Sequence, residues 1–528
     1  MEKQQYITSS VYTFADMREY NYLYVDKTEY LWKLVSHPKS MFFFSRPRRF
    51  GKSLTLSTLK AIFQGKKELF KGLYIENQPY VWKPYPVIHL DMGSVSADTP
   101  DKLEKQMTEL LKRQAKINKI ELDDKNEIGA NSLFINLVNN LYDRDGKVVI
   151  LIDEYDKPIL NNIQNENLEK LQDVMKGFYS VLKTCEPYER FVFITGVGKF
   201  FKVSIFSDLN NLTDISMSDD YATLCGYTEK ELKENFKTQL LEASKRYDED
   251  YATFLKDIKG WYDGYKFSEN GESVYNPVST AKFFEDYGKF KNYWFETGSP
   301  SILVKLIKQD SINLQEILDS EYTEEIFTDF APSNISFIAL MYQTGYLTIK
   351  DCYYEKNMDG FTETHYKLGF PNFEVEQSFH KFFISNTGNN VNLGNNIPNL
   401  MKQAMKQNNV DKMMETVNSY LSTIPNKMQI RNEKYYQTVF YSLFKIIGYY
   451  IRAEEQTSDG RIDAYIENGN NVFIFEFKLD KSSDEAFDQI MKKEYYLKFQ
   501  NSGKKITLVG ANFDFETRRL KDYKKKEL

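Results

Sequence analysis

Gly51, Lys52 and Ser53 are the residues whose types and order indicate chemistry most directly. They close a polar loop that follows a short apolar run and precedes a helical pattern at 54–63. This order predicts a phosphate-binding P-loop, in which Lys52 reaches the β- and γ-phosphates and Ser53 holds Mg²⁺. Arg46 stands where the usual pattern G-x-x-x-x-G-K-S has its first glycine. We therefore expect ATP and Mg²⁺ as cofactors. The expected nucleotide-binding residues are Arg46, Pro47, Arg48, Arg49, Phe50, Gly51, Lys52, Ser53, Leu54 and Asp153.

Asp153 and Glu154 follow a second apolar run, at 148–152, about 100 residues after the loop. An apolar strand that ends in Asp is typical of a Walker B strand, whose Asp steadies Mg²⁺ and whose next residue, Glu, polarises the attacking water. Such an acidic pair is often only a polar strand end, but its combination with the P-loop pattern favours the functional interpretation. Thr195 ends another apolar run and is our candidate sensor of the γ-phosphate or the attacking water. The alternative, that Thr195 only ends a buried strand, stays open.

The elements that must position these residues follow from the hydrophobic pattern. Short apolar runs alternate with helical patterns, which indicates a parallel sheet covered by helices on both faces. The runs lie at 41–45, 86–91, 148–152 and 191–195, and the helical patterns at 54–63, 101–117, 131–142 and 165–184. The expected fold class is α/β, with a P-loop NTPase core.

Asp463, Glu476 and Lys478 form a second constellation, near the C-terminal end. The surrounding pattern predicts the order α-β-β-β-α-β, with a hairpin turn between the strands that carry Asp463 and Glu476. Glu476 and Lys478 are two residues apart, so they point to one face of their strand. Two carboxylates can hold Mg²⁺, and a nearby lysine can position the attacking water, which suits phosphodiester hydrolysis. The alternative is a solvated hairpin face with a cross-strand salt bridge, but the flanking helices favour a metal site.

Several stretches of the first half resemble the AAA-ATPase-like family of bacterial proteins, which are P-loop ATPases with a catalytic glutamate. The stretches are Tyr24-Val25-Asp26-Lys27-Thr28, Ser45-Arg46-Pro47-Arg48-Arg49-Phe50-Gly51-Lys52-Ser53, Leu151-Ile152-Asp153-Glu154-Tyr155-Asp156-Lys157-Pro158, Phe193-Ile194-Thr195-Gly196-Val197, Ser207-Asp208-Leu209-Asn210-Asn211-Leu212 and Cys225-Gly226-Tyr227. The resemblance implies that this loop is the family's own form of the P-loop, so that Arg46 is expected there. Arg46, Arg48 and Arg49 could neutralise phosphate charge, act as an arginine finger between subunits, or pair with acids of a neighbouring loop.

The second constellation resembles the PD-(D/E)xK nuclease superfamily, as Gly460-Arg461-Ile462-Asp463 with Glu476-Phe477-Lys478. The resemblance implies a restriction-endonuclease-like α/β domain. It also matches Glu433 to an acid on the first helix and Gln489 to a glutamine on the helix after the lysine strand, while Ile462 replaces the usual Pro. The catalytic residues expected in the chain are Glu154, Thr195, Asp463, Glu476 and Lys478. The expected metal ligands are Ser53, Asp153, Glu433, Asp463 and Glu476.

The length and composition indicate several globular domains, because 528 residues exceed one ordinary core and 41% of them are hydrophobic. We expect an ATPase core at 1–225, a helical lid and winged-helix-like region at 226–383, a linker and helical connector at 384–430, and a nuclease-like domain at 431–528. Within the linker, residues 385–399 are expected as an exposed loop, since Asn and Gly are frequent there.

The net charge of −6 argues against nucleic-acid binding by the whole surface. Such binding needs a local basic surface, for example the segment 518–526, which is otherwise a solvated terminus. Three widely spaced cysteines and the lack of long apolar segments indicate a reducing, cytoplasmic setting and no membrane partner.

The leading hypothesis from the sequence is an ATP-hydrolysing protein coupled to a Mg²⁺-dependent nuclease, with nucleic acid, expected to be DNA, as its partner. One alternative is an ATP-switched regulatory protein whose nuclease-like domain binds nucleic acid or a protein without cleavage. Another is a scaffold that assembles as a homo-oligomer.

Overall fold

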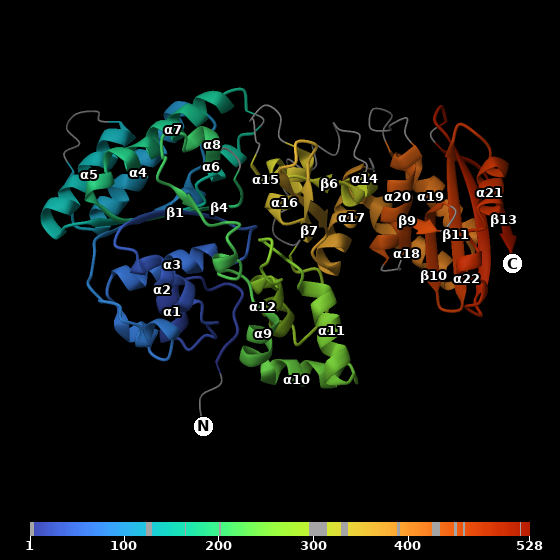
Figure 1. The fold of residues 1–528 in the computed structure, drawn as a ribbon, viewed down its shortest axis with the longest axis horizontal. Coiled ribbons are helices and arrows are strands. Elements are labelled where there is room, and N and C mark those ends of the chain that lie inside the picture. The colour runs from blue at the N-terminus through green and yellow to red at the C-terminus, as the bar shows by residue number, and fades with distance from the viewer. Residues whose placement is uncertain are drawn as a thin grey trace. The chain divides into compact units, whose positions relative to one another are not determined.

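The computed structural model describes residues 5–122, 129–163, 165–199, 202–294, 314–328, 336–387, 391–424, 433–447, 451–457, 460–517 and 519–528. The chain forms two compact units, and each is described by itself (Figure 1). The first unit is Met1–Trp294 with Tyr322–Asn372, and the second is Phe295–Glu321 with Phe373–Leu528.

A five-stranded parallel sheet forms the core of the first unit. Its strand order is β2-β3-β4-β1-β5, so one strand separates the P-loop strand β1 from the strand β3 that ends in Asp153. The strands are β1 (Ser40–Ser45), β2 (Val87–Asp91), β3 (Val148–Asp153), β4 (Glu189–Gly196) and β5 (Thr213–Asp214). The first four confirm the predicted runs, whereas β5 is too short to leave a pattern. In a parallel sheet the carboxyl ends of the strands share one edge, and the predicted site residues follow those ends.

Helices cover both faces of this sheet, as the alternating pattern predicts. Figure 1 shows α3 with α1 and α2 on one side and α4, α5 and α7 on the other. The long helices carry apolar stripes at helical spacing; in α4, for example, Leu103, Met107 and Leu110 are buried. The helices are α1 (Phe14–Glu19), α2 (Thr28–Ser36), α3 (Lys52–Phe63), α4 (Pro100–Ile117), α5 (Ala130–Asp145), α6 (Lys157–Leu160), α7 (Leu168–Thr184) and α8 (Lys202–Ile205).

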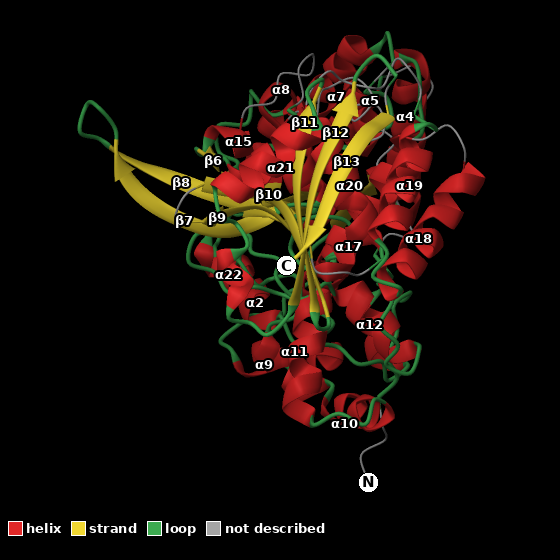
Figure 2. Cartoon of the chain, turned by 90° about the vertical axis from the view of Figure 1, so that its right-hand side faces the viewer, coloured by secondary structure: helices red, strands yellow, loops and turns green. Residues whose placement is uncertain are grey.

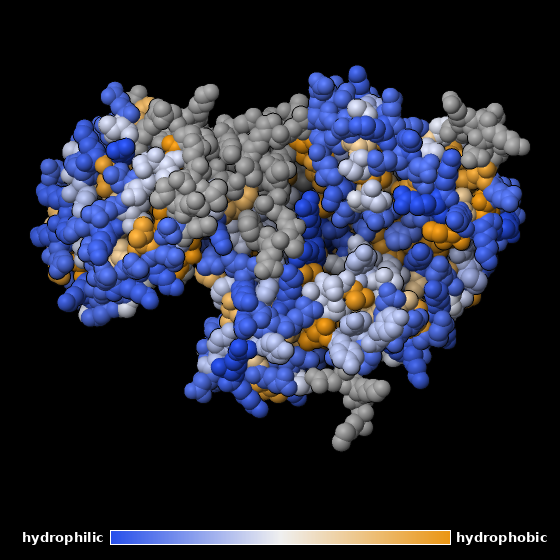
Figure 3. Space-filling model, turned by 180° about the vertical axis from the view of Figure 1, so that it is seen from behind, coloured by the Kyte–Doolittle hydropathy of each residue, from blue (hydrophilic) through white to orange (hydrophobic). Residues whose placement is uncertain are grey.

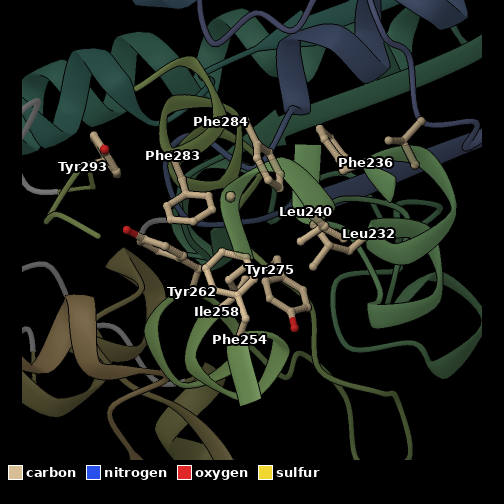
Figure 4. Packing of buried hydrophobic residues seen from close by; sticks show 12 residues of the cluster. Leu232, Phe236, Leu240, Phe254, Ile258, Tyr262, Tyr275, Phe283, Phe284 and Tyr293 are labelled. Carbon is tan, nitrogen blue, oxygen red and sulfur yellow. The ribbon is translucent and has the colours of Figure 1, made fainter. Parts of the chain in front are cut away.

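A helical lid follows the core. It consists of α9 (Glu229–Asn235), α10 (Lys237–Arg246), α11 (Tyr251–Tyr262) and α12 (Pro277–Glu285). A capping box begins α9, because Thr228 accepts from the backbone N–H of Glu231 and the Glu231 carboxylate accepts from that of Thr228. The helices pack around a core rich in aromatic residues, where Phe236, Phe254, Tyr262 and other side chains converge (Figure 4). This packing gives the lid a core of its own.

A small module, residues 322–372, completes the first unit. It contains α15 (Glu325–Thr328) and α16 (Phe337–Thr344), then a hairpin of β7 (Thr348–Lys356) and β8 (Thr362–Gly369), which pairs with the two-residue strand β6 (Glu321–Tyr322). A helix followed by a hairpin is the order that the sequence predicts here. Figure 2 shows the hairpin as a long ribbon projecting from the module.

The second unit contains a mixed five-stranded sheet with the order β13-β12-β11-β10-β9 (Figure 2). The strands are β9 (Ile451–Thr457), β10 (Gly460–Asn468), β11 (Asn471–Leu479), β12 (Lys505–Asp514) and β13 (Arg519–Glu527). Only the pair β11–β12 is parallel among these described strands. The helices are α14 (Leu314–Asp319), α17 (Phe373–Thr387), α18 (Val391–Lys406), α19 (Val410–Leu421), α20 (Glu433–Ile446), α21 (Ser483–Lys492) and α22 (Leu497–Gln500). The predicted α-β-β-β-α-β order is confirmed, followed by one further strand.

One local prediction in the second unit is wrong. Residues 385–399 are not an exposed loop: α17 runs to Thr387 and α18 begins at Val391. The helix α18 buries Ile397 and Met401, and this packing outweighs the Asn and Gly residues and even Pro398 within the helix. The basic terminus forms the edge strand β13, whose residues are mostly exposed, and Lys524 and Lys525 pair there with Asp484 and Asp411. Arg518 lies outside the described residues.

The surface of the described residues is mostly hydrophilic on the face drawn in Figure 3, and the apolar areas there are small and separate. No helix within the described ranges is both long and apolar enough to cross a lipid bilayer.

Candidate active sites

Three separately predicted residues meet at the carboxyl edge of the parallel sheet. Ser53, at the start of α3, donates its hydroxyl to Asp153 Oδ2 at 2.6 Å. Thr195, near the end of β4, donates its hydroxyl to Asp153 Oδ1 at 2.7 Å. All three are linked because β4 lies between β1 and β3. The Asp153 carboxylate is thus oriented from both sides by hydroxyl groups in a buried setting, where hydrogen bonds to a charged group are strong.

Glu154 adopts a backbone conformation that is rare for a residue other than glycine. Its φ is +51°, in the left-handed region, and its N–H donates to Asp153 Oδ1 at 3.0 Å. Its carboxylate lies against Gly93, since a Cβ added to Gly93 would be 2.6 Å from Glu154 Oε2. Lys157 approaches the same carboxylate at 3.4 Å. The strained turn aims Glu154 out of β3 and toward the cavity beside Ser53.

That cavity, of about 540 Å³, includes an acid that sequence reasoning missed. Asp91 ends β2 and lies opposite Asp153 in the strand register. Burial raises the pKa of Asp91, and the nearby Asp153 and Glu154 raise it further against a hydrogen bond from Gly93 that lowers it. The sequence pattern could have identified Asp91, because the apolar run at 86–91 ends in Asp, as the Walker B strand does, and both strands end at the same sheet edge.

Lys52 is folded back onto the P-loop. Its ammonium group is buried and donates to the carbonyl of Arg46 at 2.8 Å and to that of Pro47 at 2.9 Å. Burial lowers the pKa of Lys52, while Asp153 and Glu154 act in the opposite direction. The loop reaches α3 through Gly51, whose φ is +94°, a conformation that glycine adopts without strain.

Arg46 has a structural environment rather than an open one. Its guanidinium donates to the carbonyls of Ser45, Ser216, Tyr221 and Ala222, at 2.6 to 3.3 Å. The rings of Phe44 and Phe267 lie 4.3 and 4.2 Å from its central carbon. Burial lowers its pKa to about 10, so the group stays charged at neutral pH.

The other loop residues have different surroundings. Arg48 and Arg49 are half-buried, and Arg49 has a left-handed φ of +69°. Phe50 is buried with edge-on contacts to Tyr265 and Phe267. Among the three loop arginines, Arg46 has its guanidinium bound to backbone carbonyls, so this group does not face a phosphate site in this conformation. Its backbone carbonyl accepts from Lys52.

A smaller cavity, of about 60 Å³, lies on the other side of the start of α3. Gly51 and Leu54 form one wall, and the mostly apolar remainder comes from the N-terminal segment and the stretch just before the lid, including Tyr24, Val25, Cys225 and Tyr227. Lys27 fixes these two parts to each other, because it pairs with Glu231 at 2.7 Å and donates to the carbonyl of Thr223. The cavity residues Tyr24, Val25 and Lys27, and those at 225–227, belong to two of the stretches that carry the family resemblance.

Asp156 is a second acid that sequence reasoning did not assign, and unlike the exposed Asp91 it is fully buried. Its carboxylate accepts from the backbone N–H groups of Val197 and Gly198, at 3.0 and 3.1 Å. Burial raises its pKa to about 6. A Cβ on Gly196 would lie 2.5 Å from Tyr155 and 2.9 Å from Asp156 Oδ1, so this approach requires glycine. Asp156 thereby holds the loop after Thr195 against the loop after Asp153.

The C-terminal constellation also converges. The register that pairs Ala464 with Phe475 puts Asp463 beside Glu476 on neighbouring strands. Asp463 Oδ2 accepts from the N–H of Phe477 at 2.8 Å, and Lys478 donates to Glu476 Oε1 at 2.9 Å. Glu433, at the start of α20, accepts from the N–H of Leu479 at 3.1 Å. The structure therefore gathers around β11 all four residues that the sequence had grouped.

Glu476 is the unusual member of this group. Its Oε2 atom is buried and has no hydrogen-bond partner among the described residues. Burial raises its pKa to about 8, Asp463 and Glu433 raise it as well, and Lys478 opposes them. Burial by itself lowers the pKa of Lys478, but Glu476 beside it reverses the direction. A buried carboxylate oxygen without a partner is costly, and a cation would remove that cost.

The side chains of the C-terminal site have the ligand atoms that Mg²⁺ prefers, but their present arrangement is not that of a metal site. Carboxylate oxygens are the ligands that Mg²⁺ prefers, and Glu476 Oε2 is available for one. Within the described ranges, no three acidic, histidine or cysteine side chains are arranged to hold a metal ion together. Two reasons are visible: Asp463 and Glu433 each bond to a backbone N–H, and the Lys478 ammonium occupies Glu476 Oε1. Gln489 lies on α21, where its amide donates to Tyr495 at 3.5 Å.

Comparison with known proteins divides the chain in the same way. The family described as "Predicted AAA-ATPase" matches residues 9–206, and the PD-(D/E)XK nuclease superfamily matches residues 431–523. A protein of Azotobacter chroococcum mcd 1, named "Uncharacterized protein in vnfD 5'region", is 33% identical over 527 residues, which are 97% of this chain and 96% of that protein.

Two solved structures from Aeropyrum pernix also match at low similarity. The ORC1 protein in complex with DNA is 10% identical with a TM-score of 0.25, and covers 67% of this chain and 91% of its own. The ORC2 protein in its ADPNP-ADP complexes is 12% identical with a TM-score of 0.28, and covers 67% of this chain and 89% of its own. The full-length match to the Azotobacter protein and the two family matches lead to one assignment. This chain belongs to the same family as the Azotobacter protein, with a predicted AAA-ATPase region at its N-terminal end and a PD-(D/E)XK nuclease superfamily domain at its C-terminal end.

Proposed function

We propose that the chain binds and hydrolyses ATP in its N-terminal unit, and that ATP turnover gates or positions a Mg²⁺-dependent nuclease that acts on DNA. The observation that carries the ATPase half is the convergence of Ser53 and Thr195 on Asp153. The nuclease half rests on the grouping of Asp463, Glu476 and Lys478 on two neighbouring strands.

In the ATPase step, Lys52 leaves the two loop carbonyls and contacts the β- and γ-phosphates. Ser53 and Asp153 would hold Mg²⁺, which neutralises phosphate charge when bound. Glu154 accepts a proton from the attacking water, and Thr195 keeps the Asp153 carboxylate oriented. The apolar cavity between Leu54, Tyr24 and Tyr227 receives the adenine base, since its walls offer apolar and aromatic side chains.

In the nuclease step, Asp463, Glu476 and Glu433 would hold Mg²⁺, which neutralises the phosphodiester and activates water when bound. Lys478 withdraws from Glu476 and orients the water or takes its proton. The Lys478–Glu476 pair thus keeps the acids neutralised until a metal arrives.

The alternative function is an ATP-switched regulator whose C-terminal domain binds DNA or a partner protein without cleavage. One observation favours it: the described acids do not form a metal-binding group in this conformation. Binding that survives the loss of Asp463 and Glu476, without cleavage by the unmodified chain, is its expected signature.

The test is a cleavage assay on single-stranded, double-stranded and branched DNA, with Mg²⁺ or Mn²⁺ and with or without ATP. We expect the unmodified chain to cut at least one of these DNAs, and Asp463→Ala and Lys478→Ala to abolish cutting. Lys52→Ala should alter the effect of ATP. The matched control is Lys481→Ala, which removes an exposed lysine three residues from Lys478. ATP hydrolysis without any cutting would refute the nuclease half and favour the regulator.

A further inference from the structure

The P-loop is in direct contact with the module 322–372. The helix α16 ends at Gly345, whose φ is +88°. A Cβ on Gly345 would lie 2.7 Å from Cβ and 3.0 Å from Cγ of Pro47, so the end of α16 lies against the loop as closely as packing allows. Pro47 is also one of the two residues whose carbonyls hold Lys52.

The same module contacts the segment that follows Thr195. Gln343, near the end of α16, accepts from the backbone N–H of Lys199 at 2.6 Å. Lys199 lies four residues after Thr195, in the loop that Asp156 anchors. The module therefore contacts both segments that would lie near the phosphates. It contacts the P-loop through Pro47 and the loop after Thr195 through Lys199.

The seam between these parts is incompletely packed. A small cavity of about 30 Å³ lies there, lined by Arg46, Pro47, Lys199, Tyr342 and Gln343 among others. Two polar groups in the seam, Arg46 Nε and Gln343 Nε2, are buried and have no hydrogen-bond partner within the part of the chain that the structure describes. Unpaired buried groups are costly, which indicates that another arrangement of this seam is accessible at low cost.

Arg46 determines which part of the loop can move. Its guanidinium is fixed to the carbonyls of Ser216, Tyr221 and Ala222 and lies between two aromatic rings. The next residue, Pro47, is tied to the helix α3 only through Lys52, among the hydrogen bonds of the described residues. When Lys52 turns to a phosphate, that tie is lost, while Arg46 stays in place. The displacement therefore falls on Pro47 and, through it, on Gly345.

We propose that the module 322–372 is the reporter of the nucleotide state, with Arg46 as a fixed anchor and the Pro47–Gly345 and Lys199–Gln343 contacts as its two inputs. This inference rests on the proposed ATP binding. The hairpin β7–β8 is the output, because it begins three residues after Gly345. Thr348 fixes its base, since the Thr348 hydroxyl bonds to both the N–H and the carbonyl of Lys266. A small shift at Gly345 becomes a larger one at the tip, where Met358 and Phe361 are exposed.

The charge of the hairpin argues against binding to a nucleic-acid backbone. Over residues 348–369 it has three lysines and four acidic residues, so the net charge is 3 − 4 = −1. A surface of this charge is poorly suited to a phosphate backbone. The module is therefore placed to signal the state of the ATPase site rather than to hold DNA by its wing.

The experiment is hydrogen exchange of the full chain, followed in peptides that cover residues 337–369, without nucleotide and with Mg²⁺ plus ADP or AMP-PNP. We expect AMP-PNP to change exchange in these peptides by about threefold or more, and ADP to change it less. Gln343→Leu should remove most of this response while AMP-PNP affinity stays within about threefold of the unmodified chain. Gln343→Glu keeps the acceptor for the Lys199 N–H and should restore the response. Asp359→Asn, in the exposed hairpin turn, is the matched control and should respond normally.

The outcomes separate this inference from the proposed function. AMP-PNP binding without any exchange response in the unmodified chain overturns the reporter role and leaves ATP binding intact. A full response in a folded Gln343→Leu protein also overturns it, because the signal then does not use the Lys199 contact. If Gln343→Leu does not fold, Gly345→Ala replaces it: the added Cβ displaces Pro47, so exchange must shift already without nucleotide, and an unshifted profile refutes the coupling. Failure of the unmodified chain to bind any nucleotide overturns the proposed function itself, and this inference with it.

Discussion

The substitution Thr195→Val tests whether the ATPase site is organised around Asp153. Valine has nearly the shape of threonine, so the change removes one hydroxyl and leaves no large cavity. The lost bond is 2.7 Å long, fully buried and made to a carboxylate. A buried hydrogen bond to a charged group contributes about 1.5–3 kcal/mol. If that energy serves to orient Asp153 during hydrolysis, kcat falls by about tenfold to a hundredfold, since about 1.4 kcal/mol corresponds to a factor of ten.

The assay is steady-state ATP hydrolysis with a parallel titration of AMP-PNP binding. Thr280→Val is the matched control, because Thr280 is equally buried but its hydroxyl donates to the carbonyl of Asn276 one turn earlier in α12. That carbonyl keeps its helical N–H partner, so the control should hydrolyse ATP normally. An unchanged kcat in Thr195→Val, or a raised KM with kcat intact, would refute the role given to the Asp153 network.

Four further predictions concern the two sites and the packing of the second unit. Lys52→Ala should weaken AMP-PNP binding by about a hundredfold in a nucleotide titration, because the remaining loop offers phosphate no buried ammonium group; affinity within about threefold of the unmodified chain would contradict this. Mg²⁺ affinity of the C-terminal site, measured by calorimetry without nucleotide, should rise with pH up to about 8 and then level, because Glu476 must lose its proton to bind metal, and Glu476→Gln should remove the pH dependence. The same raised pKa makes the metal-free domain lose stability as pH rises from the ordinary carboxyl range to about 8, because the folded state binds that proton more tightly than the unfolded state. Gly510→Ala should destabilise the second unit by about 1–3 kcal/mol in thermal melts, since the new Cβ would lie 2.5 Å from Phe487 N and 2.7 Å from Ser483 O. Gly260→Ala, at an exposed helical position of α11 with open space and no positive φ, should cause no loss of stability, and equal losses in the two variants would refute the packing argument.

Much of the fold could be predicted because burial leaves direct patterns in the sequence. The runs that became β1 to β4 are continuous and apolar, as strands covered on both faces must be. Glu476 and Lys478 stood out because charges interrupt a buried strand, and β11 indeed buries seven consecutive residues. Local chemistry of this kind was enough to group Ser53, Asp153 and Thr195, and Asp463, Glu476 and Lys478, which lie close together in the structure.

Pairings between distant segments could not be read in the same way. Asp156 gains its role from the loop backbone of Val197 and Gly198, which leaves no periodic signal in the sequence. The carbonyls that hold Arg46 come from residues about 170 positions away and carry no side-chain signature. Composition misled at 385–399, where packing of Ile397 and Met401 formed a helix from polar residues. The strand at the basic terminus was not predicted because an edge strand with lysines on its surface has no apolar alternation.

The left-handed turn at Glu154 also bears on how this family can change over time. A glutamate with φ of +51° strains the backbone, by roughly 1–2 kcal/mol, and glycine would be relieved of that strain and asparagine partly so. The fold would thus become more stable by losing the group that the proposed hydrolysis needs. In a relative that did not hydrolyse ATP, replacing this Glu by Gly or Asn would increase folding stability. A relative that keeps Glu would accept the lower stability for the function of the carboxylate. On the proposed function, the residue at this position would distinguish relatives that hydrolyse ATP from relatives that only bind it.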